Sequence, residues 1–225
     1  MKPDQVLQRL DRLIESRFIL AHPFYQAWNA GELTRDQLAT YAAVYYPHVA
    51  SFPGYLERIL SQTTDDSIRD EIEQNLADEL SNPKPHPDLW LDFAQGLGLE
   101  RQEVAGAAPH PVSGKTVKTF ENLAESGVAQ GLAALYAYES QQPSVSQVKI
   151  EGLREFYGVK DPRALAYFEV HSEVDIRHRD GERRAIGRSL EDGASSDDVL
   201  GAAEQALNAY WGLLDGIHEE AGLPT

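Results

Sequence analysis

Cysteine is absent from all 225 residues of the chain. Its absence excludes structural disulfides, thiolate nucleophiles, zinc ribbons and iron–sulfur clusters. A chain of this length can bury a core large enough to fold without such cross-links. A protein without thiols is compatible with a reducing compartment, and we expect this one to be cytoplasmic.

Long apolar runs and an excess of basic residues are also missing. No apolar stretch approaches the roughly 18–20 residues of a membrane span, and the first twenty residues lack the apolar block of a signal peptide. Thirty-six acidic against twenty basic residues give a formal net charge of −16. Nucleic acids and anionic membranes bind basic surfaces, so we expect neither as a partner. A homodimer is expected only because dimers are common among soluble proteins.

Apolar residues recur at three- and four-residue intervals along most of the chain, which is typical of helices. The first segment shows the pattern clearly, with Val6, Leu7, Leu10, Leu13 and Ile14 on one face. Alternating strand patterns, fixed-period repeats and low-complexity linkers are not found. The sequence therefore predicts an all-α protein, a single domain over residues 1–225 with about seven to nine helices in an antiparallel bundle.

Prolines and capping residues place several helix boundaries. Thr34 and Gln37 have the spacing of a capping box, so a long helix should begin after Thr34. Pro47 and Pro53 are expected to kink or break that helix. Residues 100–113 are rich in Gly, Ala and Pro and are expected to form a loop around a short turn.

The most informative local pattern is HSEVDIRH at residues 171–178, in a helix expected to run from Arg163 to about Arg179. Positions i, i+4 and i+7 lie within about 40° of one another on an α-helix, so His171, Asp175 and His178 would share a stripe. The ends of that stripe are roughly 10 Å apart, which suits a ligand shared between two neighbouring ions. The acid-x-x-His step also occurs in di-iron carboxylate bundles. The alternative is a solvated polar face of a surface helix.

Three further residues have the chemistry of metal ligands. Glu79 continues the helical face of Ile72 and Leu76 and should point to the core, where an unpaired carboxylate is unfavourable. His86 follows seven residues later, and Glu139 ends the most apolar helix of the chain. The alternatives are an N-terminal capping role for His86 and an ordinary helix-end charge for Glu139.

Carboxylates and imidazoles together suit iron or manganese, whereas structural zinc prefers sulfur. Three acids neutralise most of the charge of two divalent ions and leave room for oxygen. We therefore predict two iron ions or a manganese–iron pair, dioxygen as co-substrate and an external reductant. The sequence does not distinguish the two metal pairs, because both accept the same ligands. The predicted ligands are Glu79, His86, Glu139, His171, Asp175 and His178.

This order of ligands resembles the signature of the haem-oxygenase-like di-metal oxidases. Nearly the whole chain resembles the branch named for the chlamydial protein associating with death domains, which is related to pyrroloquinoline-quinone synthases and TenA-like proteins. The resemblance implies a haem-oxygenase-like bundle of seven helices. It also implies an oxygenase that makes p-aminobenzoate for folate biosynthesis and consumes a tyrosine of its own chain.

The resemblance also implies roles for four other residues. Tyr25 would be the consumed ring, Lys149 the amine donor, and Tyr138 and Tyr167 radical or electron relays near the metals. Tyr167 precedes His171 by four residues and should stack on the ligand face. Ordinary core packing is the alternative for the tyrosines, and a solvated helix face for the lysine. The remaining histidines are expected to be structural or surface residues, namely His22, His48, His110 and His218.

Other functions remain open. The same centre could oxidise an external amine, amino acid or fatty acid. A metal-free oxidase of the quinone-synthase type is a further alternative, although those sites do not place this set of carboxylates. A non-enzymatic helical interaction protein is the third, but it gives no reason for six ligand-type residues at these spacings. A thiaminase-like activity would need a nucleophilic cysteine, which the chain lacks.

Overall fold

The computed structural model describes residues 1–224, and helices are the only regular secondary structure in this part of the chain. The all-α prediction is therefore confirmed. The elements are α1 (Pro3–Ser16), η1 (Ile19–Ala21, a 3₁₀ helix), α2 (Pro23–Asn29), α3 (Arg35–Leu60), α4 (Asp66–Ser81), α5 (His86–Gly96), α6 (Arg101–Gly106), α7 (Pro111–Ser126), α8 (Val128–Glu139), α9 (Gln142–Glu155), α10 (Pro162–His171), α11 (Val174–Glu191) and α12 (Ser196–Glu220).

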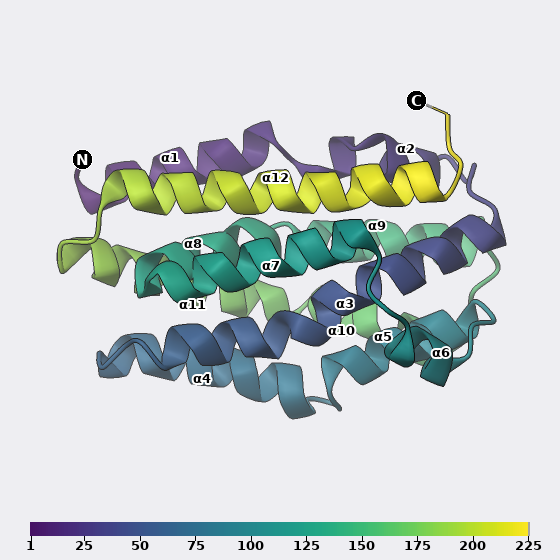
Figure 1. Ribbon diagram of the computed structural model, residues 1–225, viewed down its shortest axis with the longest axis horizontal. Coiled ribbons are helices and arrows are strands. Elements are labelled where there is room, and N and C mark those ends of the chain that lie inside the picture. The colour runs from purple at the N-terminus through teal and green to yellow at the C-terminus, as the bar shows by residue number, and fades with distance from the viewer. Residues whose placement is uncertain (225) are drawn as a thin grey trace.

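The long helices run side by side along the longest axis of the molecule (Figure 1). Helix α8 lies within the bundle, in contact with α7, α11 and α12. It is apolar on all sides, as a central helix must be, and all of its residues from Gly131 to Glu139 are buried. Helix α11 also contacts α4, which in turn contacts α3 and α5. Within residues 1–224 no helix is long and apolar enough to cross a bilayer.

Helix α3 begins as predicted but is not broken by its prolines. Thr34 Oγ1 accepts a hydrogen bond from Gln37 N at 3.3 Å, and Gln37 Oε1 accepts one from Thr34 N at 2.8 Å. The helix then continues through Pro47 and Pro53 to Leu60. Contacts with α4, α5, α7 and α8 hold both halves of α3 against the core, and this packing outweighs the hydrogen bonds that the prolines remove.

The expected loop at residues 100–113 is largely helical. Helix α6 occupies Arg101–Gly106, and Pro111 is the first residue of α7. His110 caps α7, because its Nδ1 accepts a hydrogen bond from Val112 N at 3.3 Å. Pro111 therefore starts a helix, a position in which its missing N–H has no consequence.

The helix expected from Arg163 to about Arg179 is two helices. Helix α10 ends at His171, and α11 begins at Val174 and extends to Glu191. At the junction Ser172 Oγ donates to the carbonyl of Glu169 at 2.8 Å. The two helices also have different neighbours, since α10 packs on α5 and α9 whereas α11 packs on α8, α4 and α1. This break and the unexpected short helices α2 and α6 make the helix count larger than predicted.

Candidate metal centre

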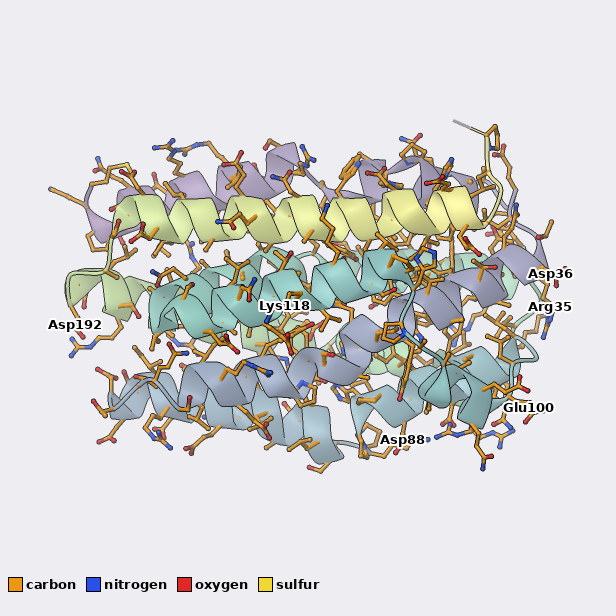
Figure 2. The ribbon with its side chains drawn as sticks, in the orientation of Figure 1. Arg35, Asp36, Asp88, Glu100, Lys118 and Asp192 are labelled. Carbon is orange, nitrogen blue, oxygen red and sulfur yellow. The ribbon has the colours of Figure 1, made fainter. Side chains whose placement is uncertain are left out.

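Charged side chains of both signs lie on the outside of the molecule, among them the acids Asp36, Asp88, Glu100 and Asp192 in Figure 2. Within residues 1–224 only four acids are buried, and all four lie near one another in the bundle. Burial of a carboxylate is unfavourable unless a cation or hydrogen bonds compensate. A cation or hydrogen bonds must therefore be sought beside these four acids. They are Glu79, Glu139, Asp175 and Glu182.

The first cluster consists of Glu79 from α4, His86 from α5 and His171 from the end of α10. Glu79 Oε1 lies 2.9 Å from His86 Nδ1 and 3.7 Å from His171 Nε2. One ligand atom of each residue lies within 4.8 Å of the other two. Three helices thus bring one carboxylate and two imidazoles around a common point.

The second cluster consists of Glu139 from α8 and Asp175 and His178 from α11. His178 Nδ1 lies 3.2 Å from Glu139 Oε1 and 3.3 Å from Asp175 Oδ1. The structure therefore brings together all six predicted ligand residues, but as two groups of three. The prediction that His171 shares one helical stripe with Asp175 and His178 is wrong, because the chain breaks after His171.

Each cluster histidine turns one ring nitrogen toward the carboxylates and the other toward a fixed acceptor. Such outer partners set the tautomer and orientation of metal-binding imidazoles. The pairs are His86 Nε2 with the Asn82 carbonyl at 3.1 Å, His171 Nδ1 with the Tyr167 carbonyl at 2.7 Å, and His178 Nε2 with Asp78 Oδ2 at 3.0 Å.

Several buried cluster atoms make no well-aligned hydrogen bond among residues 1–224, although polar atoms of the same clusters lie close to them. They are His86 Nδ1 and both carboxylate oxygens of Asp175. Glu139 is better satisfied, since the Asn75 amide donates to both of its oxygens at 3.1 Å. Unpaired lone pairs that converge in a buried space fit a cation. The donor set, oxygen and imidazole nitrogen without sulfur, suits iron or manganese.

Without metal, protons on His171 and His178 balance the carboxylates. Burial alone would raise the pKa of Glu79, but attraction to His86 and His171 lowers it to about 2. Burial would lower the pKa of His178, but the adjacent carboxylates of Asp175 and Glu139 raise it to about 11. Divalent ions would replace those protons, because ligand histidines bind in their neutral form.

Two of the predicted tyrosines line the space beside the clusters. The ring of Tyr167 stacks on His171, as predicted, with 4.0 Å between centroids. Tyr138 and Tyr167 line a cavity of about 10 Å³ together with Val49, Phe52 and cluster residues Glu79, Glu139, His171 and Asp175. This volume corresponds to about one water molecule.

Lys149 is buried rather than solvated, with 2% of its surface exposed. Its Nζ donates a hydrogen bond to the hydroxyl of Tyr41 at 2.5 Å and lies 5.0 Å from the ring centroid of Tyr25. The hydroxyls of Tyr25 and Tyr41 are 3.2 Å apart. Burial lowers the pKa of Lys149 well below its ordinary value, which favours a neutral, nucleophilic amine.

Aromatic contacts connect the clusters with the buried lysine. The Tyr45 hydroxyl is hydrogen-bonded to the Tyr138 hydroxyl at 2.9 Å, and the rings of Tyr41 and Tyr45 lie 5.2 Å apart. Trp90 provides a second connection, with centroid distances of 4.8 Å to Tyr167 and 4.9 Å to Tyr45. The sequence analysis did not single out Trp90, Tyr41 or Tyr45. Their positions could have been noticed for the two tyrosines, because residues four apart on a helix lie on the same face, as Tyr41 and Tyr45 do on α3.

A family model described as iron-containing redox enzyme matches residues 39–211. The chain belongs to the iron-containing redox enzymes. Its relatives include two named 4-aminobenzoate synthase. The protein of Nitrosomonas europaea is 40% identical over 94% of this chain and 90% of its own length. That of Chlamydia trachomatis is 39% identical over 94% of this chain and 91% of its own length.

The fold of this iron-containing redox enzyme is haem-oxygenase-like. A domain from Shewanella denitrificans, described as having a heme oxygenase-like fold, superimposes with a TM-score of 0.73 at 16% identity. The match covers 98% of this chain and 93% of that domain. The resemblance to haem-oxygenase-like oxidases inferred from the ligand spacing is therefore confirmed.

One buried acid of this redox enzyme escaped the sequence analysis. Glu182 lies on α11, four residues after His178, but the predicted helix ended near Arg179. Burial raises the pKa of Glu182 well above its usual range, and the negative charge of Glu139 raises it further. The sequence did contain a signal for Glu182, because it follows His178 by four residues, the same spacing that separates His171 and Asp175.

The remaining histidines lie outside both clusters. His22 caps α2 by accepting a hydrogen bond from Phe24 N at 3.1 Å, and its Nε2 lies 3.0 Å from Asp215. His48 is buried against Phe120, with 4.7 Å between ring centroids. His110 caps α7, and His218 lies near the C-terminal end of α12. These positions agree with the expected structural or surface roles.

Proposed function

We propose that this protein is a di-metal oxygenase that makes p-aminobenzoate from its own residues. Glu79, His86 and His171 would hold one ion, and the second cluster would hold the other. Two iron ions or a manganese–iron pair would supply the redox chemistry with dioxygen, and an external reductant would complete the electron balance. Family membership and the names of the 4-aminobenzoate synthase relatives support this proposal.

The small size of the cavity beside the clusters is the observation that favours an internal substrate over an external small molecule. Its volume is about 10 Å³, whereas pockets for small molecules usually measure roughly 300–1,000 Å³. The cavity accommodates a molecule of the size of dioxygen but not an amino acid or a fatty acid. A substrate already within the protein removes the need for such a pocket.

Tyr25 and Lys149 have the positions that such an internal substrate requires. Both are buried, and the amine lies 5.0 Å from the centroid of the phenol ring. The lowered pKa of Lys149 favours the free amine that a new carbon–nitrogen bond would need. Tyr138 and Tyr167 lie between the clusters and this pair and would carry oxidising equivalents from one to the other.

The metal content of the protein tests the first part of the proposal. Protein loaded anaerobically with ferrous iron and manganese, then desalted, should contain close to two ions per chain by plasma mass spectrometry. His171→Ala should lower that number, because it removes one of three ligands of the first cluster. Wild-type protein without bound metal would refute the di-metal centre.

The identity of the substrate needs a separate test. Tyr25→Phe should retain the metal ions but form no p-aminobenzoate, measured by liquid chromatography and mass spectrometry. Tyr136→Phe is the matched control, because the Tyr136 hydroxyl binds Asp11 near the surface. Wild-type product should not exceed one molecule per chain and should carry ¹⁵N from lysine-labelled protein. Product from Tyr25→Phe, or several turnovers per chain, would favour an external substrate.

A further inference from the structure

Glu182 is a buried acid without a basic partner. The residue is 4% exposed, and neither carboxylate oxygen makes a well-aligned hydrogen bond in the part of the chain that the structure describes. The next two residues are arginines, but Arg183 binds Asp11 at 3.0 Å and Arg184 binds Glu71 at 2.8 Å. The group that acts most strongly on Glu182 is the carboxylate of Glu139, which lies within hydrogen-bond reach if one of the two acids is protonated. Two buried carboxyl groups side by side are unfavourable unless a proton or a cation lies between them. The pair therefore indicates a cation that the polypeptide does not provide.

The position of Glu182 on α11 indicates where that cation would lie. Residues 175, 178 and 182 follow one another at i, i+3 and i+7, so their side chains leave the helix within about 60° of one another. This is the face of α11 that carries the two ligands of the second cluster. The charged neighbours that act on Glu182 are Glu139 and Asp175, both of them acids. Three carboxyl groups thus adjoin one imidazole.

The charge of the centre leads to the same conclusion. The two clusters contain three carboxylates, Glu79, Glu139 and Asp175, and three imidazoles that are neutral as ligands. Two divalent ions carry four positive charges, so three carboxylates leave one charge uncompensated in a buried site. Glu182 supplies the fourth negative charge. A low-dielectric interior strongly favours such neutrality.

We propose that Glu182 is a further protein ligand of the ion in the second cluster, beside Glu139, Asp175 and His178. The inference rests on the proposed di-metal function and extends it. Glu182 is not one of the three residues whose ligand atoms already lie within 4.8 Å of one another, so its carboxylate moves onto the ion when the ion binds. A residue with this role should affect metal retention and not the stability of the metal-free fold.

Metal binding by Glu182→Gln tests the assignment, because glutamine keeps the shape of the side chain and removes its charge. Glu191→Gln is the matched control, since Glu191 lies on the same helix with 63% of its side chain exposed. Each protein would be stripped with a chelator, titrated anaerobically with ferrous iron, desalted and analysed by plasma mass spectrometry. Loss of an outer partner of a metal ligand typically weakens binding about 10–100-fold, and loss of a ligand should weaken it at least as much.

We expect close to two ions per chain for wild type and Glu191→Gln, and close to one for Glu182→Gln. Glu182→Asp, which keeps the charge, should recover part of the binding. Melting temperatures of the metal-free proteins should not fall in Glu182→Gln. Two ions held equally tightly by wild type and Glu182→Gln would overturn the assignment and leave the di-metal function intact. A lowered melting temperature of metal-free Glu182→Gln would show a structural role instead, and wild type without metal would overturn both proposals.

Discussion

The ring of Tyr167 lies against the imidazole of His171, with 4.0 Å between their centroids and 28° between their planes. The backbone carbonyl of Tyr167 also accepts the hydrogen bond of His171 Nδ1 at 2.7 Å. One residue thus orients a predicted metal ligand through its backbone and places a phenol beside that ligand through its side chain. These two effects can be separated by mutation.

Tyr167→Phe removes only the hydroxyl group and keeps both the ring and the carbonyl. We expect unchanged metal content, because the orientation of His171 does not depend on the phenol oxygen. Formation of p-aminobenzoate should be largely lost, because phenylalanine is much harder to oxidise than tyrosine. The measurements are metal content and product per chain, with Tyr136→Phe as control. Full product formation by Tyr167→Phe would exclude an obligatory relay through this residue.

Asp78→Asn tests the outer partner of His178. Asp78 Oδ2 lies 3.0 Å from His178 Nε2, and asparagine keeps an acceptor oxygen but loses the charge. We expect metal affinity at the second cluster to fall about 10–100-fold, while the first cluster keeps its ion. Competition with a chelator of known affinity measures both sites. The control is Asp180→Asn, which should behave like wild type because 57% of the Asp180 side chain is exposed. Equal metal affinities of wild type, Asp78→Asn and Asp180→Asn would contradict a role for Asp78.

The contribution of His178 to the stability of the metal-free protein should decline as the pH rises. The pKa of His178 is raised from 6.5 to about 11, so its contribution is complete below pH 6.5 and declines from there toward pH 11. The raised pKa values of Asp175 and Glu182 act in the same direction. Glu79 acts oppositely, because its pKa is lowered from 4.5 to about 2 and its contribution is lost below pH 4.5.

We therefore compare wild type with His178→Gln after chelator treatment, because all other titrating groups, Lys149 among them, are common to both proteins. From pH 6.5 to 9 the advantage of wild type in melting temperature should shrink by several degrees, at about 2–4 °C for each kcal/mol. Thermal scans across this range measure the effect. A difference that grows up to pH 9 would contradict the ionisation described for the clusters.

Lys149→Met should stabilise the protein while abolishing product formation. Burial lowers the pKa of Lys149 well below 10.5, so folding shifts the lysine toward its neutral form, which costs free energy at pH values below 10.5. Methionine has a similar length and no charge, and the Tyr41 hydroxyl keeps the Tyr25 hydroxyl as a partner at 3.2 Å. We expect a melting temperature a few degrees higher at pH 7, at about 2–4 °C for each kcal/mol.

The difference between Lys149→Met and wild type should shrink as the pH approaches 10.5, because the unfolded lysine then also loses its proton. A destabilised variant at pH 7 would show that the hydrogen bond and the aromatic contacts of Lys149 outweigh its burial. Lys160→Met, at an exposed position, is the control for a change from lysine to methionine.

Much of this protein could be predicted from local patterns. The period of 3.6 residues made Glu79 face the core, and it is 3% exposed. The capping box at Thr34 and the stacking of Tyr167 on His171 followed from spacings of three and four residues along a helix. The types and order of the six clustered residues were visible as well, since they depend only on side-chain chemistry and position in the chain.

Only the tertiary structure decided how these residues are grouped. His171 is three residues from Val174, yet the break between α10 and α11 assigns it to Glu79 and His86, and Asp175 and His178 to Glu139. The burial of Lys149 and of Glu182 likewise depends on which helices cover them. Periodicity determines the face on which a side chain lies, because it is a property of one helix. The neighbours that this face meets are set by the packing of distant segments, and that packing leaves no local signal.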